Sequence, residues 1–198
     1  MVCGRIGRHY WAMDTDARQL MAELREDHRN MSIVLDLLAD LVVDMEAGNH
    51  PDFELFDEIM RYMTVYPDAV HHPKEDVVYG QLRERRPDLS EDLDHVPDDH
   101  VEIARLGSLL RDDVEAINAG AAVVRREKMI ADTSAYVTRL REHMNWEETD
   151  LFSRIDLMLN AEPYRIDVSE YQHIKDPVFE LEIEAGFRRL IASIRPAA

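Results

Sequence analysis

Apolar residues recur between Leu20 and Met45 at the three- and four-residue spacing of one helical face. They are Met21, Leu24, Met31, Leu35, Leu38, Val42 and Met45. His28 occupies the position on this face between Leu24 and Met31. Gly48, which is typical of the residue after a helix, predicts that the helix ends at residues 47–49. A histidine within a buried face needs a polar partner, so His28 is the first candidate for a special role.

A second helix is expected to begin near Phe53, after Pro51 and Asp52, and to run toward His71. Its apolar face consists of Phe56, Ile59, Met63, Tyr66 and Val70. Pro67 and Pro73 each remove a backbone donor and crowd the carbonyl group four residues earlier. We therefore expect a kinked helix that stops before Pro87, with two shorter helices joined at residues 66–67 as the alternative.

Residues 90–99 form an acidic connector, after which Asp98 or Asp99 is expected to cap a third helix. The core positions of this third helix are His100, Ile103, Leu106 or Gly107, Leu110, Val114 and Ile117. Residues 118–120 end it. A fourth helix is expected at about 122–160, with core positions Ile130, Val137, Leu140, His143, Glu147, Leu151 and Ile155. Four long helices with short connections predict an all-α fold, an up-down-up-down four-helix bundle.

The expected organisation has three parts. Residues 1–12 lack periodicity and are expected to be a flexible tail, residues 13–160 form the bundle, and residues 161–198 form a C-terminal extension. The extension is expected to contain an extra amphipathic helix from residues 176–177 onward, with an apolar face of Phe179, Ile183, Phe187, Leu190 and Ile194. This face must cover either its own bundle or a second subunit, and the second option predicts a homodimer.

Six chemistry-bearing residues form a duplicated pattern, in which two histidines lie 43 positions apart and a glutamate follows the second by four. The two copies are His28, His71 and Glu75, and His100, His143 and Glu147. A gap of four places both side chains on one helical face. A helix of about 20 residues is roughly 30 Å long, so about 40 residues up one helix and down the next return to the same level. Six unpaired polar groups in a core would each cost a few kcal/mol, and two divalent cations would offset all six.

Composition narrows the range of functions. The chain has 198 residues, 45% hydrophobic and 32% charged, as expected for one globular domain. Its 41 acidic and 23 basic residues give a net charge of −18, which disfavours nucleic acid and membrane surfaces as partners. Cys3 is the sole cysteine, so a disulfide or a cysteine-held iron–sulfur cluster within one chain is excluded. With no apolar run of membrane-spanning length and no signal-peptide pattern, we expect a cytoplasmic protein.

Four short segments resemble the hemerythrin-like, or HHE cation-binding, proteins: EDHR at 26–29, HHPKED at 71–76, DH at 99–100 and EHMNWEE at 142–148. The resemblance covers about residues 20–160. It implies a four-helix bundle that holds two non-haem irons joined by an oxo or hydroxo group. Imidazole and carboxylate ligands suit Fe or Mn and also permit Zn, so Mn or Zn could substitute.

By matching position, the resemblance implies that His28 and His71 bind one iron, that His100 and His143 bind the other, and that the two glutamates, Glu75 and Glu147, bridge them. One departure changes the expected function. Oxygen-carrying members have a second histidine four residues from the third-helix ligand, where this chain has Val96 and Ala104. Two histidines per metal leave open coordination positions, which favour redox turnover or small-ligand binding over oxygen transport.

We therefore expect a protein that binds or senses O₂, NO or peroxide, or that handles iron. The alternatives are a peroxidase- or oxidase-like enzyme and an iron donor for iron–sulfur repair. No catalytic residue is identified, and a binding protein is favoured over an enzyme. The repair members carry a cysteine-bearing N-terminal region, and Cys3 alone argues against that subtype. A third alternative is a non-catalytic bundle that serves as an interaction module.

Other polar residues are weaker candidates. His9, His50, His72 and His95 are expected to be non-ligands, with His72 facing solvent or lying behind the ligands. Glu170 and His173 form a single Glu-x-x-His pair, whereas ferritin-type di-iron sites use two. Tyr79 is expected to pack or to reach the metal shell, Asp76 to accept a hydrogen bond from a ligand, and Glu148 to replace Glu147 only if the helix were rotated.

Overall fold

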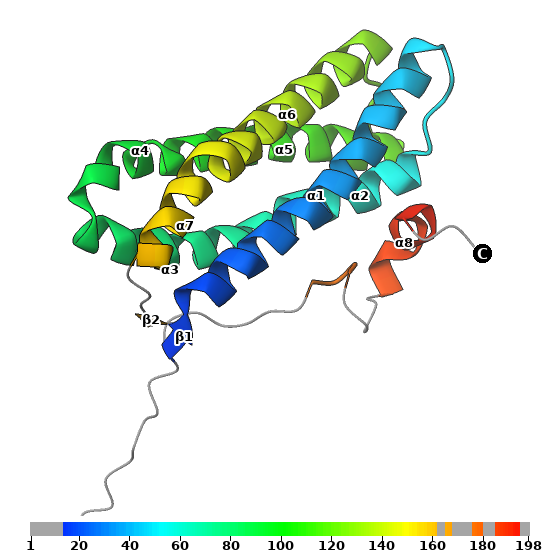
Figure 1. Ribbon diagram of the computed structural model, residues 1–198. Coiled ribbons are helices and arrows are strands. Elements are labelled where there is room, and N and C mark those ends of the chain that lie inside the picture. The colour runs from blue at the N-terminus through cyan, green and yellow to red at the C-terminus, as the bar shows by residue number, and fades with distance from the viewer. Residues whose placement is uncertain (1–13, 162–164, 168–175, 180–184, 195–198) are drawn as a thin grey trace, which may run out of the picture.

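The chain folds as an all-α, up-down-up-down four-helix bundle with an additional C-terminal helix (Figure 1). The computed structural model describes residues 14–161, 165–167, 176–179 and 185–194. The first two bundle helices are α1 (Ala17–Glu46) and α2 (Phe53–Tyr66), the latter continuing through η1 (Pro67–His71) into α3 (His72–Arg85). The other two are α5 (Val96–Asn118) and α6 (Arg126–Trp146), the latter continuing through η3 (Glu147–Leu151) into α7 (Phe152–Ala161). Because α1 packs on α2 and α6, and α5 also packs on both, the four helices close into a ring.

Local chemistry fixes several helix ends where the sequence predicts them. Gly48 follows α1 with a φ of +88°, which residues with a Cβ rarely adopt, and its amide donates to Met45 at 3.1 Å. Gly120 has a φ of +65° after α5. At the start of α2, the side chain of Asp52 accepts hydrogen bonds from the amides of Glu54 and Leu55, both at 3.1 Å. The expected ends of the first and third helices and the expected start of the second are therefore confirmed.

The second helix stays continuous at its two prolines. Residues Pro67–His71 form a π-helical turn, η1, between α2 and α3, so the alternative of two separate helices is wrong. A wider turn accommodates a residue such as Pro67 that lacks the backbone donor and crowds the preceding turn. A second π turn, η3, interrupts the fourth helix at Glu147–Leu151, where no proline announces it. Such turns are frequent at functional sites, and both flank the histidine–glutamate pairs.

Other expected boundaries are wrong. The acidic connector is partly helical: η2 (Pro87–Leu89) leads into α4 (Ser90–Asp94) at the start of the connector, and α5 begins within it at Val96. Asp98 and Asp99 lie in its first turn and are not its caps, because Pro97 without an amide donor is accommodated at the helix start. The fourth helix begins at Arg126 rather than at residue 122, since Arg125 has extended backbone angles.

The C-terminal helix is shorter than expected and packs on its own bundle. In the described part of the extension, η4 (Ala185–Phe187) leads into α8 (Arg188–Ile194), which contacts α1 and α2. Leu190 is fully buried there, and Ile183 lies outside the described residues. Residues 176–179 form a turn rather than a helix start, because the side chain of Asp176 accepts hydrogen bonds from the amides of Val178 and Phe179. The homodimer stays a prediction without support from this helix.

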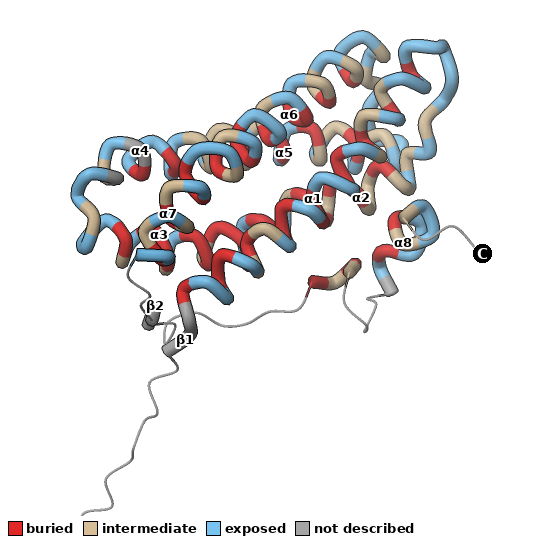
Figure 2. Tube along the Cα trace, in the orientation of Figure 1, coloured by how far each residue is buried: buried red, intermediate tan, exposed pale blue. Residues whose placement is uncertain are grey.

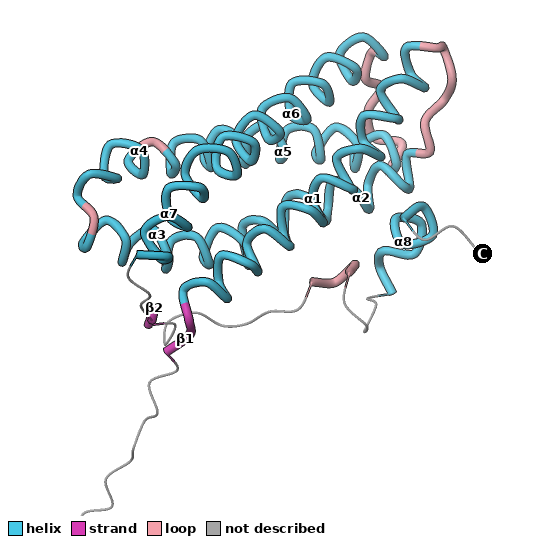
Figure 3. The backbone as a smooth tube through the Cα atoms, viewed as in Figure 1, coloured by secondary structure: helices cyan, strands magenta, loops and turns pink. Residues whose placement is uncertain are grey.

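Two three-residue strands, β1 (Asp14–Asp16) and β2 (Arg165–Asp167), pair antiparallel beside the start of α1 (Figure 3). The sequence pattern did not predict this pairing. No helix within the described part of the chain is long and apolar enough to cross a membrane. The expected flexible tail, residues 1–12, lies outside the described residues, as does Cys3.

Buried residues line the interior of the bundle along its length (Figure 2). They form two hydrophobic clusters. Each of the four long helices contributes residues to both clusters. Along each helix in turn, the last residue of one cluster and the first residue of the other are Leu24 and Met31, Val70 and Val78, Val96 and Ile103, and Met144 and Leu151. Five of the six residues of the duplicated pattern lie between these positions, and the sixth, His143, directly precedes Met144. The bundle therefore has a polar layer between two apolar cores, which is where a charged or metal-binding site would be shielded from water.

Candidate metal centre

The four histidines of the duplicated pattern meet inside the bundle in two pairs. The Nε2 atoms of His28 and His71 are 3.1 Å apart, and those of His100 and His143 are also 3.1 Å apart. The first pair joins α1 to the end of η1, and the second joins α5 to α6. The equal spacing of 43 positions therefore does return each histidine to the level of its partner, as predicted.

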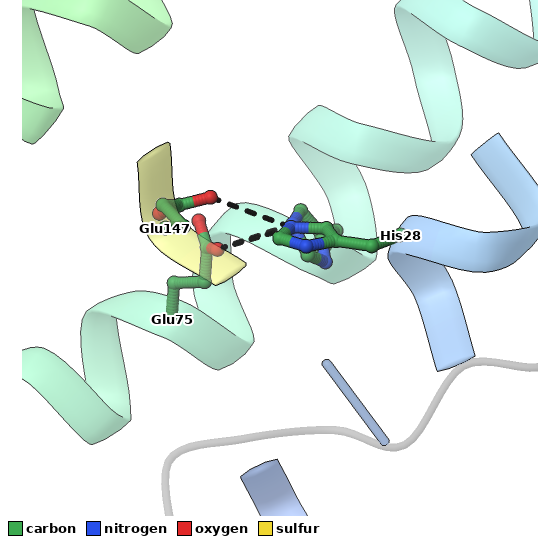
Figure 4. A group of neighbouring side chains, drawn as sticks. His28, Glu75 and Glu147 are labelled. Atoms are coloured by element: carbon green, nitrogen blue, oxygen red, sulfur yellow. Dashed lines mark hydrogen bonds and ion pairs between the residues drawn. The ribbon is translucent and has the colours of Figure 1, made fainter. Parts of the chain in front are cut away.

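Glu75 and Glu147 lie between the histidine pairs and contact both. Figure 4 shows the two carboxylates facing His28. Glu75 places Oε1 3.1 Å from His71 Nε2 and Oε2 3.3 Å from His100 Nε2. Glu147 Oε2 lies 3.3 Å from His28 Nε2 and 3.4 Å from His143 Nε2. Both glutamate side chains are completely buried. Each carboxylate thus spans the two pairs, as a bridging ligand would.

Two overlapping groups of four side chains each bring one ligand atom within 4.8 Å of the others. The first group is His28, His71, Glu75 and Glu147, and the second is Glu75, His100, His143 and Glu147. The two groups share both glutamates. This arrangement offers two adjacent cation positions, each with two imidazole nitrogens and two carboxylates.

The outer nitrogen, Nδ1, of each histidine in the first pair faces a carboxylate. His28 Nδ1 lies 3.0 Å from Glu148 Oε1, and His71 Nδ1 lies 3.3 Å from Asp27 Oδ2. Because an ionised carboxylate only accepts, Nδ1 carries a proton in each case, and Nε2 is the nitrogen left facing inward to bind a metal. This is the arrangement in which histidines bind metals.

Asp27 is the centre of a buried network behind His71. Its carboxylate accepts hydrogen bonds from Lys74 Nζ at 2.7 Å and from the Tyr66 hydroxyl at 2.9 Å. Burial raises the pKa of Asp27, but the bonds and charges of His71 and Lys74 outweigh it and hold that pKa below its usual 3.8. The acceptor for His71 therefore stays ionised. The sequence analysis missed Asp27 and Lys74 as part of the site, although each directly precedes a predicted ligand in the chain.

Without a cation, protons hold the first histidine pair together with the carboxylates. Burial lowers the pKa of His71, but the charge of Glu75 and the bond to Asp27 outweigh it and raise that pKa to about 10. The positive charge of His71 and the nearby imidazole of His100 in turn hold the pKa of Glu75 well below its usual value, against its burial. At the second pair, burial lowers the pKa of His143. Metal-free protein therefore keeps a compensated ion pair in its core.

Tyr79 reaches this centre from one turn beyond Glu75. Its hydroxyl donates to Glu147 Oε1 at 2.9 Å and lies 3.3 Å from Glu75 Oε1. Burial, followed by the charges of the two glutamates, raises the pKa of Tyr79 well above 10, so the hydroxyl keeps its proton. Both roles expected for Tyr79 are observed: the ring packs in the second hydrophobic cluster, and the hydroxyl contacts the two glutamates.

The residues present fit a pair of cations. Glu75 Oε2 and Glu147 Oε2 are buried and accept no hydrogen bond from any described residue, although both face imidazole nitrogens. A buried carboxylate oxygen without a hydrogen bond costs free energy that a divalent cation would recover. Imidazole nitrogen with carboxylate oxygen is a donor set that suits Fe, Mn or Zn.

A groove of about 560 Å³ opens on the bundle surface beside the centre. It is lined by Arg25, His28, Arg29, Ser32, Ile33, Arg141, Met144, Asn145 and Glu148. His28 is thus both a wall residue of the groove and a member of the first group. A small molecule in the groove would be separated from the first cation position by the side chain of His28.

The remaining candidates separate clearly. His72 is buried and stacks on His100 with ring centroids 3.8 Å apart, so it lies behind a ligand position and does not face solvent. His95 packs on Trp146, and His50 is exposed; neither belongs to the two groups. His9, Glu170 and His173 lie outside the described residues.

Two expectations about acidic residues change. Asp76 is exposed, so its expected role as an acceptor for a ligand is wrong; the helix turns it outward, and Asp27 and Glu148 supply the acceptors. Glu148 does not replace Glu147 and instead faces the outer nitrogen of His28. Glu147 and Glu148, the first two residues of η3, thus face opposite nitrogens of the His28 ring.

The fold and this site together define a helical-bundle protein with side chains arranged to hold metal cations. The chain matches the family model described as hemerythrin HHE cation binding domain over residues 19–173. The protein belongs to the hemerythrin HHE cation-binding family. Searches of curated proteins and of solved structures each gave no match.

Proposed function

We propose that this protein is a non-haem di-iron protein that binds or senses O₂, NO or peroxide. The observation that carries the proposal is the duplicated ligand set: two histidine pairs share two buried glutamates at one level of the bundle. His28 and His71 would hold one iron, His100 and His143 the other, and Glu75 and Glu147 would bridge them. Ferrous ions there would supply the electrons that such diatomic or peroxide ligands accept.

The chain's own residues would prepare the centre for such ligands. Asp27 and Glu148 keep the inner lone pairs of His71 and His28 available, and Tyr79 holds the bridging carboxylates in place. The second position has only two histidines, because the positions four residues before and after His100 are Val96 and Ala104 and offer no further histidine ligand. Open coordination positions follow from that small ligand set, and the groove beside His28 supports access for a small molecule.

Metal analysis tests the proposal. Protein loaded anaerobically with Fe²⁺ and dialysed should retain close to two irons per chain, and its visible absorption should change when O₂ or NO is added. His28→Ala and His100→Ala should each lower the retained iron, whereas His50→Ala, an exposed histidine outside both groups, should not. Retention well below one iron per chain by the unaltered protein would overturn the proposal.

A peroxidase- or oxidase-like activity is the second candidate. The groove favours it, because a small oxidant would reach His28 directly. Peroxide consumption by iron-loaded protein, compared with His100→Ala, decides between binding and turnover. Equal rates would remove the peroxidase activity while leaving the binding function intact. An iron-donor role would instead predict release of iron to an apo iron–sulfur protein.

A further inference from the structure

We propose that the two cation positions are unequal: the position at His28 and His71 fills first and binds tightly, and the position at His100 and His143 fills last and exchanges. This inference rests on the proposed function, because it assumes that the duplicated set holds two cations. Both positions share Glu75 and Glu147, so the bridging carboxylates cannot distinguish them. Any difference must come from the histidines and from what holds each imidazole in place.

The first pair is fixed from outside on both imidazoles. His28 Nδ1 has Glu148 at 3.0 Å, and its ring stacks on Phe152 with a centroid distance of 5.3 Å and an interplanar angle of 10°. His71 Nδ1 has Asp27 at 3.3 Å. Both histidines are at most 3% exposed. The first cation therefore meets two imidazoles whose orientation is already set.

The outer carboxylates of the first pair are themselves held. Asp27 is bonded by Lys74 and Tyr66, as described above. Glu148 is paired with Arg25, whose Nε lies 3.5 Å from Glu148 Oε2, and Arg25 also donates to Asp156 at 2.6 Å. Lys74 neutralises Asp27, and Arg25 neutralises Glu148. The outer carboxylates therefore orient the imidazoles of the first position without adding net negative charge to it. Loss of such outer partners typically lowers metal affinity 10- to 100-fold.

The second pair lacks this support. His143 Nδ1 is buried and makes no hydrogen bond with any described residue; the nearest carboxylate, Asp99 at 3.5 Å, accepts from Arg139 instead. No hydrogen bond from a described residue reaches His100 Nδ1. His100 is positioned instead by its stack on His72, and its side chain is 12% exposed, against 2–4% for the other three histidines. It also lies near the start of α5, where helices fray.

The difference in support sets the order of filling. Binding at the second position must first orient two imidazoles whose outer nitrogens make no hydrogen bond with a described residue, and this ordering costs free energy that the first position does not require. We expect the first dissociation constant for Fe²⁺ to be at least about tenfold lower than the second, the lower end of the effect of outer partners. The exchangeable position is then the one at His100, where the ligand is nearest to solvent.

Anaerobic equilibrium dialysis against Fe²⁺, with metal analysis and circular dichroism on the same samples, tests this order. His100→Ala should retain one tightly bound iron, and His28→Ala should retain one iron that binds at least tenfold more weakly. Glu148→Gln changes a partly exposed side chain and leaves all six proposed ligands in place. It should weaken binding of the first iron about tenfold and leave binding of the second iron unchanged. Glu127→Gln, the same change at an exposed position of α6, is the matched control and should alter neither step.

The outcomes separate the two proposals. Two irons that bind with constants equal within threefold, or tighter binding in His28→Ala than in His100→Ala, would overturn the unequal positions while the di-iron function stands. Binding of less than one iron by the unaltered protein would overturn the function itself. If His28→Ala fails to fold by circular dichroism, Glu148→Gln decides: an unchanged first step contradicts the inference.

Discussion

The Tyr79 hydroxyl donates to Glu147 Oε1 across a distance of 2.9 Å and so links the second helix of the bundle to the fourth at the level of the six candidate ligands. It also lies 3.3 Å from Glu75, the other shared carboxylate. Tyr79 is therefore the one described residue outside the two metal-binding groups that hydrogen-bonds to both glutamates, and its removal is the first prediction.

Tyr79→Phe should destabilise metal-free protein by about 1–3 kcal/mol, because buried carboxylate oxygens lose their donor. Denaturant unfolding of metal-free protein measures this. Tyr136→Phe is the matched control: its buried hydroxyl donates to the Met63 carbonyl, away from the site. It should leave iron retention unchanged, whereas Tyr79→Phe should lower it. Identical iron retention in both variants would contradict a role for Tyr79 in holding the glutamates.

Removal of the metal should leave the bundle folded but less stable. The metal-free core stays compensated because His71, with a pKa of about 10, carries the positive charge beside Glu75 at neutral pH. Free Fe²⁺ at 100 times its dissociation constant adds about 2.7 kcal/mol to the free energy of unfolding for one site. We expect unchanged far-UV circular dichroism and a lower melting temperature after chelation. Loss of helix on chelation would show that the metal is needed for folding.

Lys74→Met should lower the free energy of unfolding by about 3–5 kcal/mol, as expected when one partner of a buried ion pair is removed. Lys74 is 3% exposed and donates to Asp27 at 2.7 Å, so the variant leaves a buried carboxylate with less compensation. Lys128→Met is the control, since Lys128 is exposed beside Asp113 and Asp132, and exposed ion pairs contribute about 1 kcal/mol or less. Equal losses of unfolding free energy in the two variants would argue against the buried network.

Asp176 gives a pH dependence that concerns the C-terminal extension. Burial raises the pKa of Asp176 above 3.8, against the bonds from Val178, Phe179, Tyr62 and Asn30. The folded state thus binds this proton more tightly than the unfolded state does, so ionisation of Asp176 costs stability. Its contribution is most favourable below about 3.8 and declines as the pH rises through the raised pKa of the folded state.

Asp176→Asn removes this titration. The unfolding free energy of the unaltered protein minus that of Asp176→Asn should decrease as the pH rises from 3.8 and then level off. Denaturant unfolding over a pH series measures the difference, with the exposed Asp40→Asn on α1 as the control. A difference that increases with pH would show that the hydrogen bonds to Asp176, not its burial, dominate.

The all-α bundle and the six residues that meet in its core could be predicted from the sequence. Both depend on regularities that are local to the chain: the apolar spacing around His28 follows the helical period, and an interval of 43 positions follows from the rise per residue and the length of a helix. The glycines that end α1 and α5 act through their own backbone angles, so they too were predictable.

Only the tertiary structure decided which groups surround those six residues. Glu148 meets His28 across 120 positions, and Asp27 meets His71 across 44, because the rotation of each helix and its crossing with the next set which side chain faces the outer nitrogen. The same holds for the π turn at Glu147 and for the docking of α8 on α1 and α2. A periodic pattern shows which face of a helix is buried, but the contacts made there depend on how separate helices pack together.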